Sequence, residues 1–295
     1  MFVTALTGDV GAGKSTMSRI WRDMGANVVG ADEVAKEQWM RPEVARIASD
    51  RWGDDIYRPD GRPNYAKIAE RAFSNEAEHR FTNELIHPRT RVEITRRVNA
   101  LRGWIVAEIP LFFEAGGHDW VDHIVFVTAA RAARAARNAA RNWDEREILR
   151  REKNLLSSGE KQKKSDLVLS NDGDLAAWGR RARELGAHFL RVAGVCELQT
   201  CCGSFEEAQK IASLLVKKRL AACVNIGEVK SIYRWQGKTE ADAEWSLTCK
   251  TTQSARREAI ACIKVNHPYD LPAITATELC HADYATLAWV AENCV

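Results

Sequence analysis

The sequence predicts two successive α/β units, a doubly wound parallel sheet followed by a smaller antiparallel α+β sheet. Strands and helices alternate through residues 1–193, as in a parallel sheet with helices on both faces. Residues 194–295 instead run in the order βαββαβ. The composition changes at the same place, because all eight cysteines lie at or after Cys196 and all four methionines at or before Met40. We therefore expect domains at residues 1–193 and 194–295.

The composition argues against several classes of protein. Its 45% hydrophobic and 28% charged residues are typical of globular chains and leave disorder unexpected. The most apolar stretch, residues 104–113, is far shorter than the roughly 20 residues of a membrane span and contains Glu108 and Pro110. A net charge of +3 does not indicate nucleic-acid binding. Because a buried strand is expected already at residues 2–7, we expect no signal peptide, a cytoplasmic location and reduced thiols.

A glycine-rich loop at residues 8–16, GDVGAGKST, follows this first strand and fits G-x-x-x-x-G-K-[ST]. Apolar residues at helical spacing come next, from Met17 to Met24, and Gly25 ends the expected helix. Backbone amides of such a loop bind phosphates, its lysine neutralises their charge, and its hydroxyl ligates Mg²⁺. The motif predicts a nucleoside triphosphate site. Its expected contacts are Gly11, Ala12, Gly13, Lys14, Ser15 and Thr16, with Ser15 also on Mg²⁺.

An acid follows the second expected strand, residues 27–30. Strand ends on the loop side of an open α/β sheet face the ligand, so Asp32 should lie near the phosphates. It could accept a proton from an attacking hydroxyl or help to hold Mg²⁺. It could equally cap a helix at residues 33–39, and the spacing leaves both interpretations open.

Two more strands are expected at residues 104–108 and 123–128, before a helix with arginines on one face. This face can close over transferring phosphates and stabilise their charge, although a solvated surface helix is the commoner outcome. We expect one or two of the arginines to act on phosphates. They are Arg131, Arg134, Arg137 and Arg141.

Taken together, the motifs of residues 1–190 resemble those of the dephospho-coenzyme A kinases. The carrying motifs are 5–8 before the glycine loop, 30–32, 52–54, 60–62, 87–88, 110–114, Arg137 with Arg141, 165–166 and 170–171. The resemblance implies a P-loop nucleoside-monophosphate-kinase-like fold, with a helical substrate-binding insertion near residues 60–100 and a lid near 138–165. It also implies transfer of the ATP γ-phosphate, with Mg²⁺, to the ribose 3′-hydroxyl of dephospho-CoA. Asp32 would be the base, Lys14 and Arg141 the charge stabilisers, and Ser15 the Mg²⁺ contact.

Two positions depart from that family's pattern. The family usually has Asp-Ala-Asp where this chain has Gly30-Ala31-Asp32, and Gly-Ile-Gly where it has Asp9-Val10-Gly11. Loss of the first acid bears on how Mg²⁺ or substrate is positioned. A carboxylate at Asp9 would repel phosphate if it pointed into the loop, so we expect it to point outward.

Residues 194–295 predict a ferredoxin-like sheet. We expect strands at 195–200, 221–235, 244–251 and 273–280, and helices at 204–219, 252–265 and 284–293. The cysteines form no C-x-x-C pair, and adjacent Cys201 and Cys202 cannot easily converge on one ion, so most should be small buried apolar residues. His267 is near plausible partners, but alone it is weak evidence for a ligand.

Residues 196–295 resemble the CutA-type divalent-cation tolerance proteins. The motifs are 219–225, 231–238, 250–251 and 267–272. The resemblance implies a trimer built through edge strands of the long hairpin, and copper binding with Cys223 as the thiolate ligand. Ala273 stands where the family usually has Glu.

The leading interpretation is a dephospho-CoA kinase fused to a trimerising module that binds Cu²⁺, with no nucleic acid or membrane partner. A short junction at residues 191–195 suggests three kinases on one trimeric hub. Two alternatives stay open: a P-loop kinase for another small alcohol or nucleotide, and a non-catalytic regulator responsive to ATP and metal.

Overall fold

A computed structural model describes residues 1–139, 144–153, 155–279 and 282–294. They form two compact units, each described below by itself. The first comprises Val3–Arg22 and Asn27–Gly173, and the second Met1–Phe2, Asp23–Ala26 and Asp174–Val295. Compactness does not say where a chain divides into independently folding domains, so the boundary between residues 193 and 194 stays a prediction.

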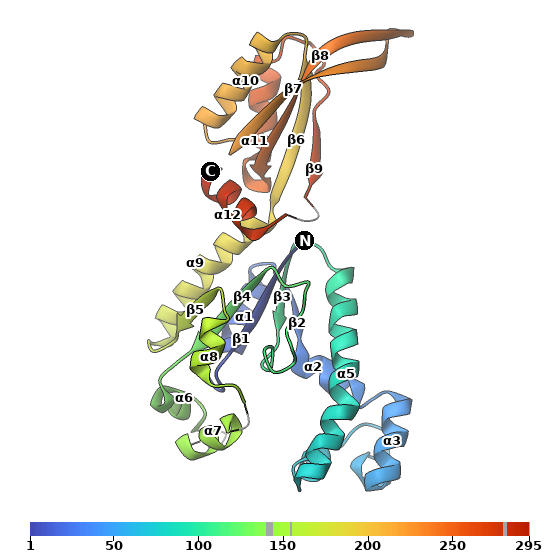
Figure 1. The fold of residues 1–295 in the computed structure, drawn as a ribbon, viewed down its shortest axis with the longest axis vertical. Coiled ribbons are helices and arrows are strands. Elements are labelled where there is room, and N and C mark those ends of the chain that lie inside the picture. Colours follow the sequence, from blue (N-terminus) through green and yellow to red (C-terminus); the bar gives the residue numbers. More distant parts are fainter. Residues whose placement is uncertain (140–143, 154, 280–281, 295) are drawn as a thin grey trace. The chain divides into compact units, whose positions relative to one another are not determined.

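The first unit is built on a five-stranded parallel sheet (Figure 1). Its strands are, in spatial order, β2 (Asn27–Gly30), β3 (Trp104–Glu108), β1 (Phe2–Gly8), β4 (His123–Thr128) and β5 (Leu167–Ser170). Every residue of the central strand β1 is buried, as expected where helices cover both faces. The predicted parallel sheet is confirmed. Because β1 lies between β3 and β4, the loop after it faces the carboxyl ends of both neighbours.

Helices α1 (Lys14–Asp23) and α2 (Ala31–Gln38) each follow a strand, as the alternation predicts. Helix α1 buries Met17 and Trp21, and the Trp21 ring packs on Trp104 of β3 with centroids 5.2 Å apart. After β4 come α6 (Arg131–Arg137), α7 (Glu145–Glu152) and α8 (Ser158–Lys163). The segment expected as a lid thus contains separate short helices, of which α8 contacts β4.

A helical insertion between β2 and β3 has its own small core. It contains α3 (Pro42–Trp52), the 3₁₀ turn η1 (Asp54–Ile56), α4 (Tyr65–Ala72) and α5 (Glu76–Ala100). The insertion begins earlier than the resemblance implied, at Pro42, because α3 also packs into this core. The buried core residues are Trp39, Val44, Ala48, Ile56, Ile68, Leu85 and Ile86.

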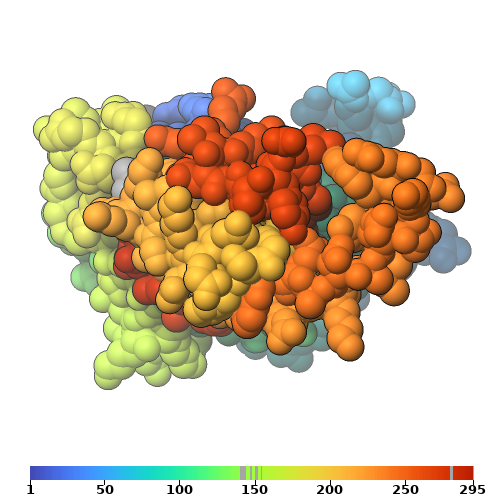
Figure 2. Space-filling model, turned by 90° about the horizontal axis from the view of Figure 1, so that it is seen from above, coloured from blue at the N-terminus to red at the C-terminus, as the bar shows by residue number. Residues whose placement is uncertain are grey.

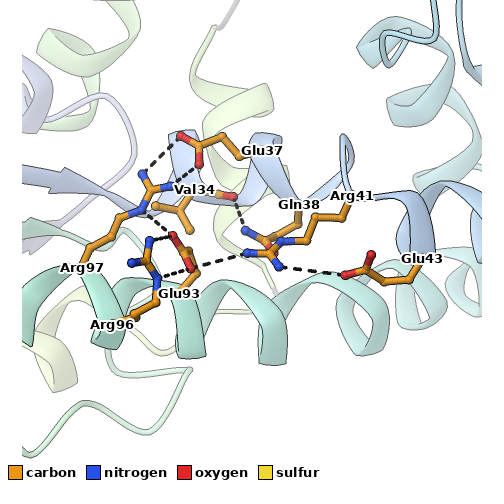
Figure 3. A network of polar contacts seen from close by, with 8 residues as sticks. All are labelled: Val34, Glu37, Gln38, Arg41, Glu43, Glu93, Arg96 and Arg97. Carbon is orange, nitrogen blue, oxygen red and sulfur yellow. Dashed lines mark hydrogen bonds and ion pairs between the residues drawn. The ribbon is translucent and has the colours of Figure 1, made fainter.

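A polar network fastens α2 to α5 (Figure 3). The Arg97 guanidinium donates to Glu37 of α2 and, at 2.9 Å, to Glu93 of its own helix. Arg96 also pairs with Glu93 at 2.7 Å, and Arg41 approaches the same carboxylate at 3.5 Å. Since Glu93 is buried, its charge needs these partners. The network holds the last turn of α2 in place, and the first turn of the same helix carries a candidate site residue.

The second unit contains a four-stranded antiparallel sheet in the order β7 (Cys223–Trp235), β8 (Lys238–Thr252), β6 (Val195–Cys202), β9 (Thr275–Glu278). Helices α10 (Phe205–Lys217) and α11 (Gln253–Asn266) contribute to one core with the sheet, so they cover the same face. This confirms the predicted ferredoxin-like arrangement. Helices α9 (Leu175–Ala193) and α12 (Tyr284–Asn293) pack against each other. Cys280, in the last expected strand, lies outside the described residues.

The β7–β8 hairpin projects beyond the rest of its own unit (Figures 1 and 2). Within the hairpin, β6 pairs only with residues Trp245–Thr252 of β8. Among the described residues, the outer part of the hairpin, towards its Gln236-Gly237 turn, therefore has strand pairing only between β7 and β8. Both turn residues have positive φ, 47° and 83°, as a tight two-residue turn requires. Across the described part of the chain, no helix has the length and apolar character needed to cross a bilayer.

Candidate active site

The glycine-rich loop lies between β1 and α1, as the motif predicts. Gly8 has φ 143°, and a Cβ there would stand 2.0 Å from the carbonyl oxygen of Val127 on β4. No other residue fits this close approach of two backbones. Gly11 and Gly13 also have positive φ, 76° and 104°. The glycines of the motif are therefore required by backbone geometry.

The side chain of Lys14 folds back along the loop. Its Nζ donates to the carbonyl oxygens of Gly8 at 3.0 Å and Asp9 at 2.9 Å. Burial lowers the pKa of the Lys14 amine. Nearby carboxylates oppose this shift; they are Glu108, Asp9 and Asp32, in order of effect. A buried cation at a phosphate-type loop, with acids around it, is an arrangement suited to anionic substrate and divalent metal.

Glu108, the last residue of β3, joins the loop from the neighbouring strand. Its Oε1 accepts from Ser15 Oγ at 2.9 Å, and its Oε2 accepts from Ser18 Oγ at 2.6 Å. Hydroxyl and carboxylate oxygens are the donors that Mg²⁺ prefers, so this pair fits the ion that the motif implies. Sequence reasoning missed Glu108. The available signal was an acid at the carboxyl end of a strand close to the glycine loop.

Asp32 lies in the first turn of α2. The helix begins at Ala31 and its N-cap is Gly30, so the alternative of Asp32 as the capping residue is wrong. The side chain is exposed, and within the described residues no hydrogen bond holds its carboxylate. It is close enough to raise the pKa of Lys14. An exposed carboxylate beside the lysine can accept a proton, which a capping carboxylate could not do freely.

The arginines of α6 have different surroundings. Arg134 is buried, pairs with Glu152 and donates to the carbonyl oxygen of Val10 in the loop at 3.1 Å. Arg137 reaches the carbonyl oxygen of Gly173 at 3.3 Å. Arg134 is therefore committed to holding the loop. Arg141, the predicted charge stabiliser, lies outside the described residues.

The Asp9 carboxylate turns to partners outside the loop, as expected, but it is buried rather than exposed to solvent. Only 7% of the residue is exposed, and its Oδ2 accepts from Thr128 Oγ1 at 2.5 Å and Ser158 Oγ at 3.0 Å. These hydroxyls come from the end of β4 and the start of α8. Hydrogen bonds from these two hydroxyl groups therefore replace the water that an exposed carboxylate would bind.

A family model for dephospho-CoA kinase matches residues 2–177. The chain belongs to the dephospho-CoA kinase family. A protein of Corynebacterium diphtheriae named dephospho-CoA kinase is 33% identical over 196 residues, which cover 64% of this chain and 98% of that protein. The crystal structure of TT1252 from Thermus thermophilus matches with a TM-score of 0.52 and 26% identity, covering 63% of this chain and 96% of its own. The predicted resemblance of the first part of the chain is confirmed.

The second predicted resemblance is confirmed as well. A family model for CutA1 divalent ion tolerance protein matches residues 196–293. A solved divalent cation tolerance protein (CutA1) from Thermus thermophilus is 39% identical, with a TM-score of 0.34, and covers 34% of this chain and 99% of its own. This member of the dephospho-CoA kinase family therefore carries a CutA1-like part after its kinase part.

In the kinase part, the position of the missing family acid has room for a Cβ atom. A Cβ at Gly30 would make only an ordinary contact, 3.6 Å from Glu33 Oε2. Backbone φ at Gly30 is −94°, which any residue adopts. Glycine is therefore not required at position 30.

The CutA1-like part does not gather metal ligands around Cys223. This half-buried residue begins β7 and pairs with Lys250 of β8, next to Cys249, whose pKa burial raises to about 12. Among the described residues, no group of three His, Cys, Asp or Glu is placed to hold an ion. His267 Nε2 lies 3.3 Å from Thr200 Oγ1 and 3.7 Å from Cys202 Sγ, and burial lowers its pKa. Copper at Cys223 stays a prediction.

Proposed function

We propose that the kinase part transfers the γ-phosphate of ATP to the ribose 3′-hydroxyl of dephospho-CoA. One observation carries the proposal: the exposed Asp32 carboxylate lies in the first turn of helix α2, at the carboxyl end of β2, near enough to the buried Lys14 amine of the glycine loop to raise its pKa. An acid able to take a proton and a cation able to hold phosphate are the two groups that the reaction needs side by side.

The Asp32 carboxylate accepts the proton of the 3′-hydroxyl while the oxygen of that hydroxyl bonds to the γ-phosphorus. The bond from that phosphorus to the β–γ bridging oxygen breaks, and ADP leaves with the electron pair. Lys14 and the loop amides of residues 11–16 stabilise the negative charge on the phosphates. The family resemblance adds Arg141 to these cations. Mg²⁺, when bound, neutralises phosphate charge, and Ser15 would hold it.

In this proposal Glu108 also contributes to the Mg²⁺ site. Its carboxylate orients the Ser15 hydroxyl and supplies a negative charge beside the phosphates. A strand-end acid next to a P-loop serine is a common Mg²⁺ arrangement in P-loop enzymes. In this proposal Glu108 is an acid available to the ion in a chain that has glycine at position 30.

Replacing Asp32→Asn tests the base. We expect CoA formation to fall by about 10²- to 10⁴-fold, while ATP affinity stays near that of the wild type. Glu33→Gln is the matched control, because Glu33 is the next residue of the same turn and is also exposed. Unimpaired product formation by the Asp32→Asn protein would refute the role of this acid.

The acceptor is tested with ATP and a panel of alcohols and nucleotides. We expect turnover with dephospho-CoA. Turnover only with another acceptor would favour a different P-loop kinase, and ATP binding without transfer to any acceptor would favour the non-catalytic regulator.

For the CutA1-like part we propose a trimer formed through the β7–β8 hairpin. The hairpin presents apolar side chains, with Ile232 78% and Trp235 49% exposed, and among the described strands β7 lies at the edge of its sheet. An edge of this kind is a ready pairing surface. Light scattering should give the mass of a trimer, and Ile232→Glu with Trp235→Glu should give a monomer. A monomeric wild type would remove the hub that joins three kinases.

Copper binding at Cys223 and a cytoplasmic location complete the proposal. In calorimetric titration with Cu²⁺, the Cys223→Ser protein should show no heat of binding. Cys262→Ser is the control, because Cys262 is another half-buried thiol and should still bind. Equal binding by both variants would exclude Cys223. The seven described cysteines are free thiols, which suits a reducing compartment.

A further inference from the structure

Asp9 is a residue of the glycine loop whose side chain bonds outside the loop. Its buried Oδ2 receives hydroxyl hydrogen bonds from Thr128 and Ser158. Gln162 Nε2 donates to the same Ser158 oxygen at 3.0 Å. Because the amide supplies that proton, the single Ser158 hydroxyl proton is left for the carboxylate. The bond therefore runs from α8 to the loop.

The backbone of Asp9 holds the loop's lysine. Its carbonyl oxygen accepts from Lys14 Nζ at 2.9 Å and from the amide of Ala12 at 3.2 Å. Its amide donates to Val127 of β4 at 2.9 Å. A shift of Asp9 would thus move the lysine and the loop turn together. The contact with α8 acts on the residue that places the phosphate-binding cation.

Helix α8 is itself firmly anchored. Lys161 is buried, and its Nζ lies 2.6 Å from Glu114 Oε1. The same oxygen accepts from the amide of Leu156 at 3.2 Å. Charge pairs of this kind resist separation when they are buried. Ser158 therefore projects from a fixed support, even though it belongs to a segment expected to move as a lid.

We propose that Asp9, tied to Ser158, is a positioning residue that fixes the glycine loop and Lys14 for ATP binding; this rests on the proposed ATP-dependent function. Two effects of the carboxylate oppose each other. Its charge repels phosphate, whereas its hydrogen bonds hold the loop in shape. Because the two hydroxyl groups hydrogen-bond to the Asp9 carboxylate, they reduce its repulsion of phosphate. The main effect of the Asp9 side chain is then to hold the loop in shape.

Calorimetric titration of the full chain with ATP separates these effects. Ser158→Ala keeps the charge and removes the tie, so we expect ATP to bind about five- to tenfold more weakly. Ser157→Ala is the matched control: the neighbouring serine caps α8 and has no bond to Asp9, and we expect affinity within about twofold of the wild type. Ser158→Thr keeps a hydroxyl and should restore binding.

Asp9→Gly completes a double-mutant cycle. It should weaken ATP binding to a similar extent. Adding Ser158→Ala to it should not weaken ATP binding further, because the two residues act through one contact. In turnover, the KM for ATP should rise while the KM for dephospho-CoA stays constant, a split that a loss of fold stability would not produce.

Tighter ATP binding by Asp9→Gly would show that the charge dominates and would overturn the proposal. Wild-type affinity in Ser158→Ala, or an equal loss in Ser157→Ala, would overturn it too. A wild-type chain that does not bind ATP would instead refute the proposed function, so the two failures are distinguishable.

Discussion

Replacing Glu108→Gln tests the link between β3 and the glycine loop. The amide keeps one acceptor oxygen, so one of the two charge-assisted bonds, from Ser15 and Ser18, becomes neutral, and at the other serine the amide NH2 can only donate. The buried Ser18 bond should lose about 1.5 kcal/mol and the exposed Ser15 bond about 0.5 kcal/mol. The sum of about 2 kcal/mol corresponds to about a 30-fold fall in kcat/KM if the contacts are needed in the transition state.

The assay is CoA formation over a range of Mg²⁺ concentrations and pH values. We expect half-saturation at a higher Mg²⁺ concentration, because a negative charge near the ion is gone. Glu108 also opposes the lowering of the Lys14 pKa by burial. Without it that pKa falls further, and since the ammonium form is the active one, the alkaline loss of activity should begin at lower pH.

Glu84→Gln, at an exposed glutamate of α5, is the matched control and should leave both profiles unchanged. A Glu108→Gln protein with wild-type Mg²⁺ dependence and a wild-type alkaline limb would refute the reasoning. A shift of one profile alone would show that Glu108 acts only on the metal or only on the lysine.

Three further predictions follow from the kinase part. Gly30→Asp, at a position where an added Cβ makes only an ordinary contact, should lower the Mg²⁺ concentration at half-saturation about threefold without reducing the melting temperature. A higher Mg²⁺ requirement would contradict this. Arginine hydrogen bonds lower the pKa of Glu93 to about 2, so its contribution to stability is present above about pH 4.5 and is lost as pH falls towards 2. Urea unfolding should show Glu93→Gln less stable at pH 7 but losing less stability on acidification, and parallel pH curves would exclude this. In the same assay, Lys161→Met should lower the free energy of unfolding by about 3–5 kcal/mol, because it leaves the Glu114 carboxylate without its cation. Adding Glu114→Gln should recover part of that loss. No recovery would mean that the ion pair is not the cause.

Local patterns predicted the glycine loop and most elements because their information lies within a few residues. The strands at residues 104–108 and 123–128 and the helix at 284–293 have the predicted bounds. Helix α2 starts earlier than expected, at Ala31, because Gly30 adopts extended backbone geometry at the N-cap. That small displacement matters: it leaves the Asp32 carboxylate outside the cap and available for chemistry.

The contacts around the site could not be predicted, since they join residues far apart in the chain. Glu108 meets Ser15 only because β3 lies beside β1, and no periodicity in the sequence specifies that neighbour. The burial of the Asp9 side chain could not be predicted for a similar reason. Its burial depends on two hydroxyl groups that come from β4 and α8.

By itself, the sequence determined a phosphate-binding loop, an acid after the second strand and a ferredoxin-like second part. These follow from backbone sterics, hydrophobic periodicity and short motifs, all of which act locally. Only the tertiary structure decided which acids surround Lys14 and which helix supports the loop. Strand order and helix docking set those distances, and a carboxylate's effect depends on the distance to its partner.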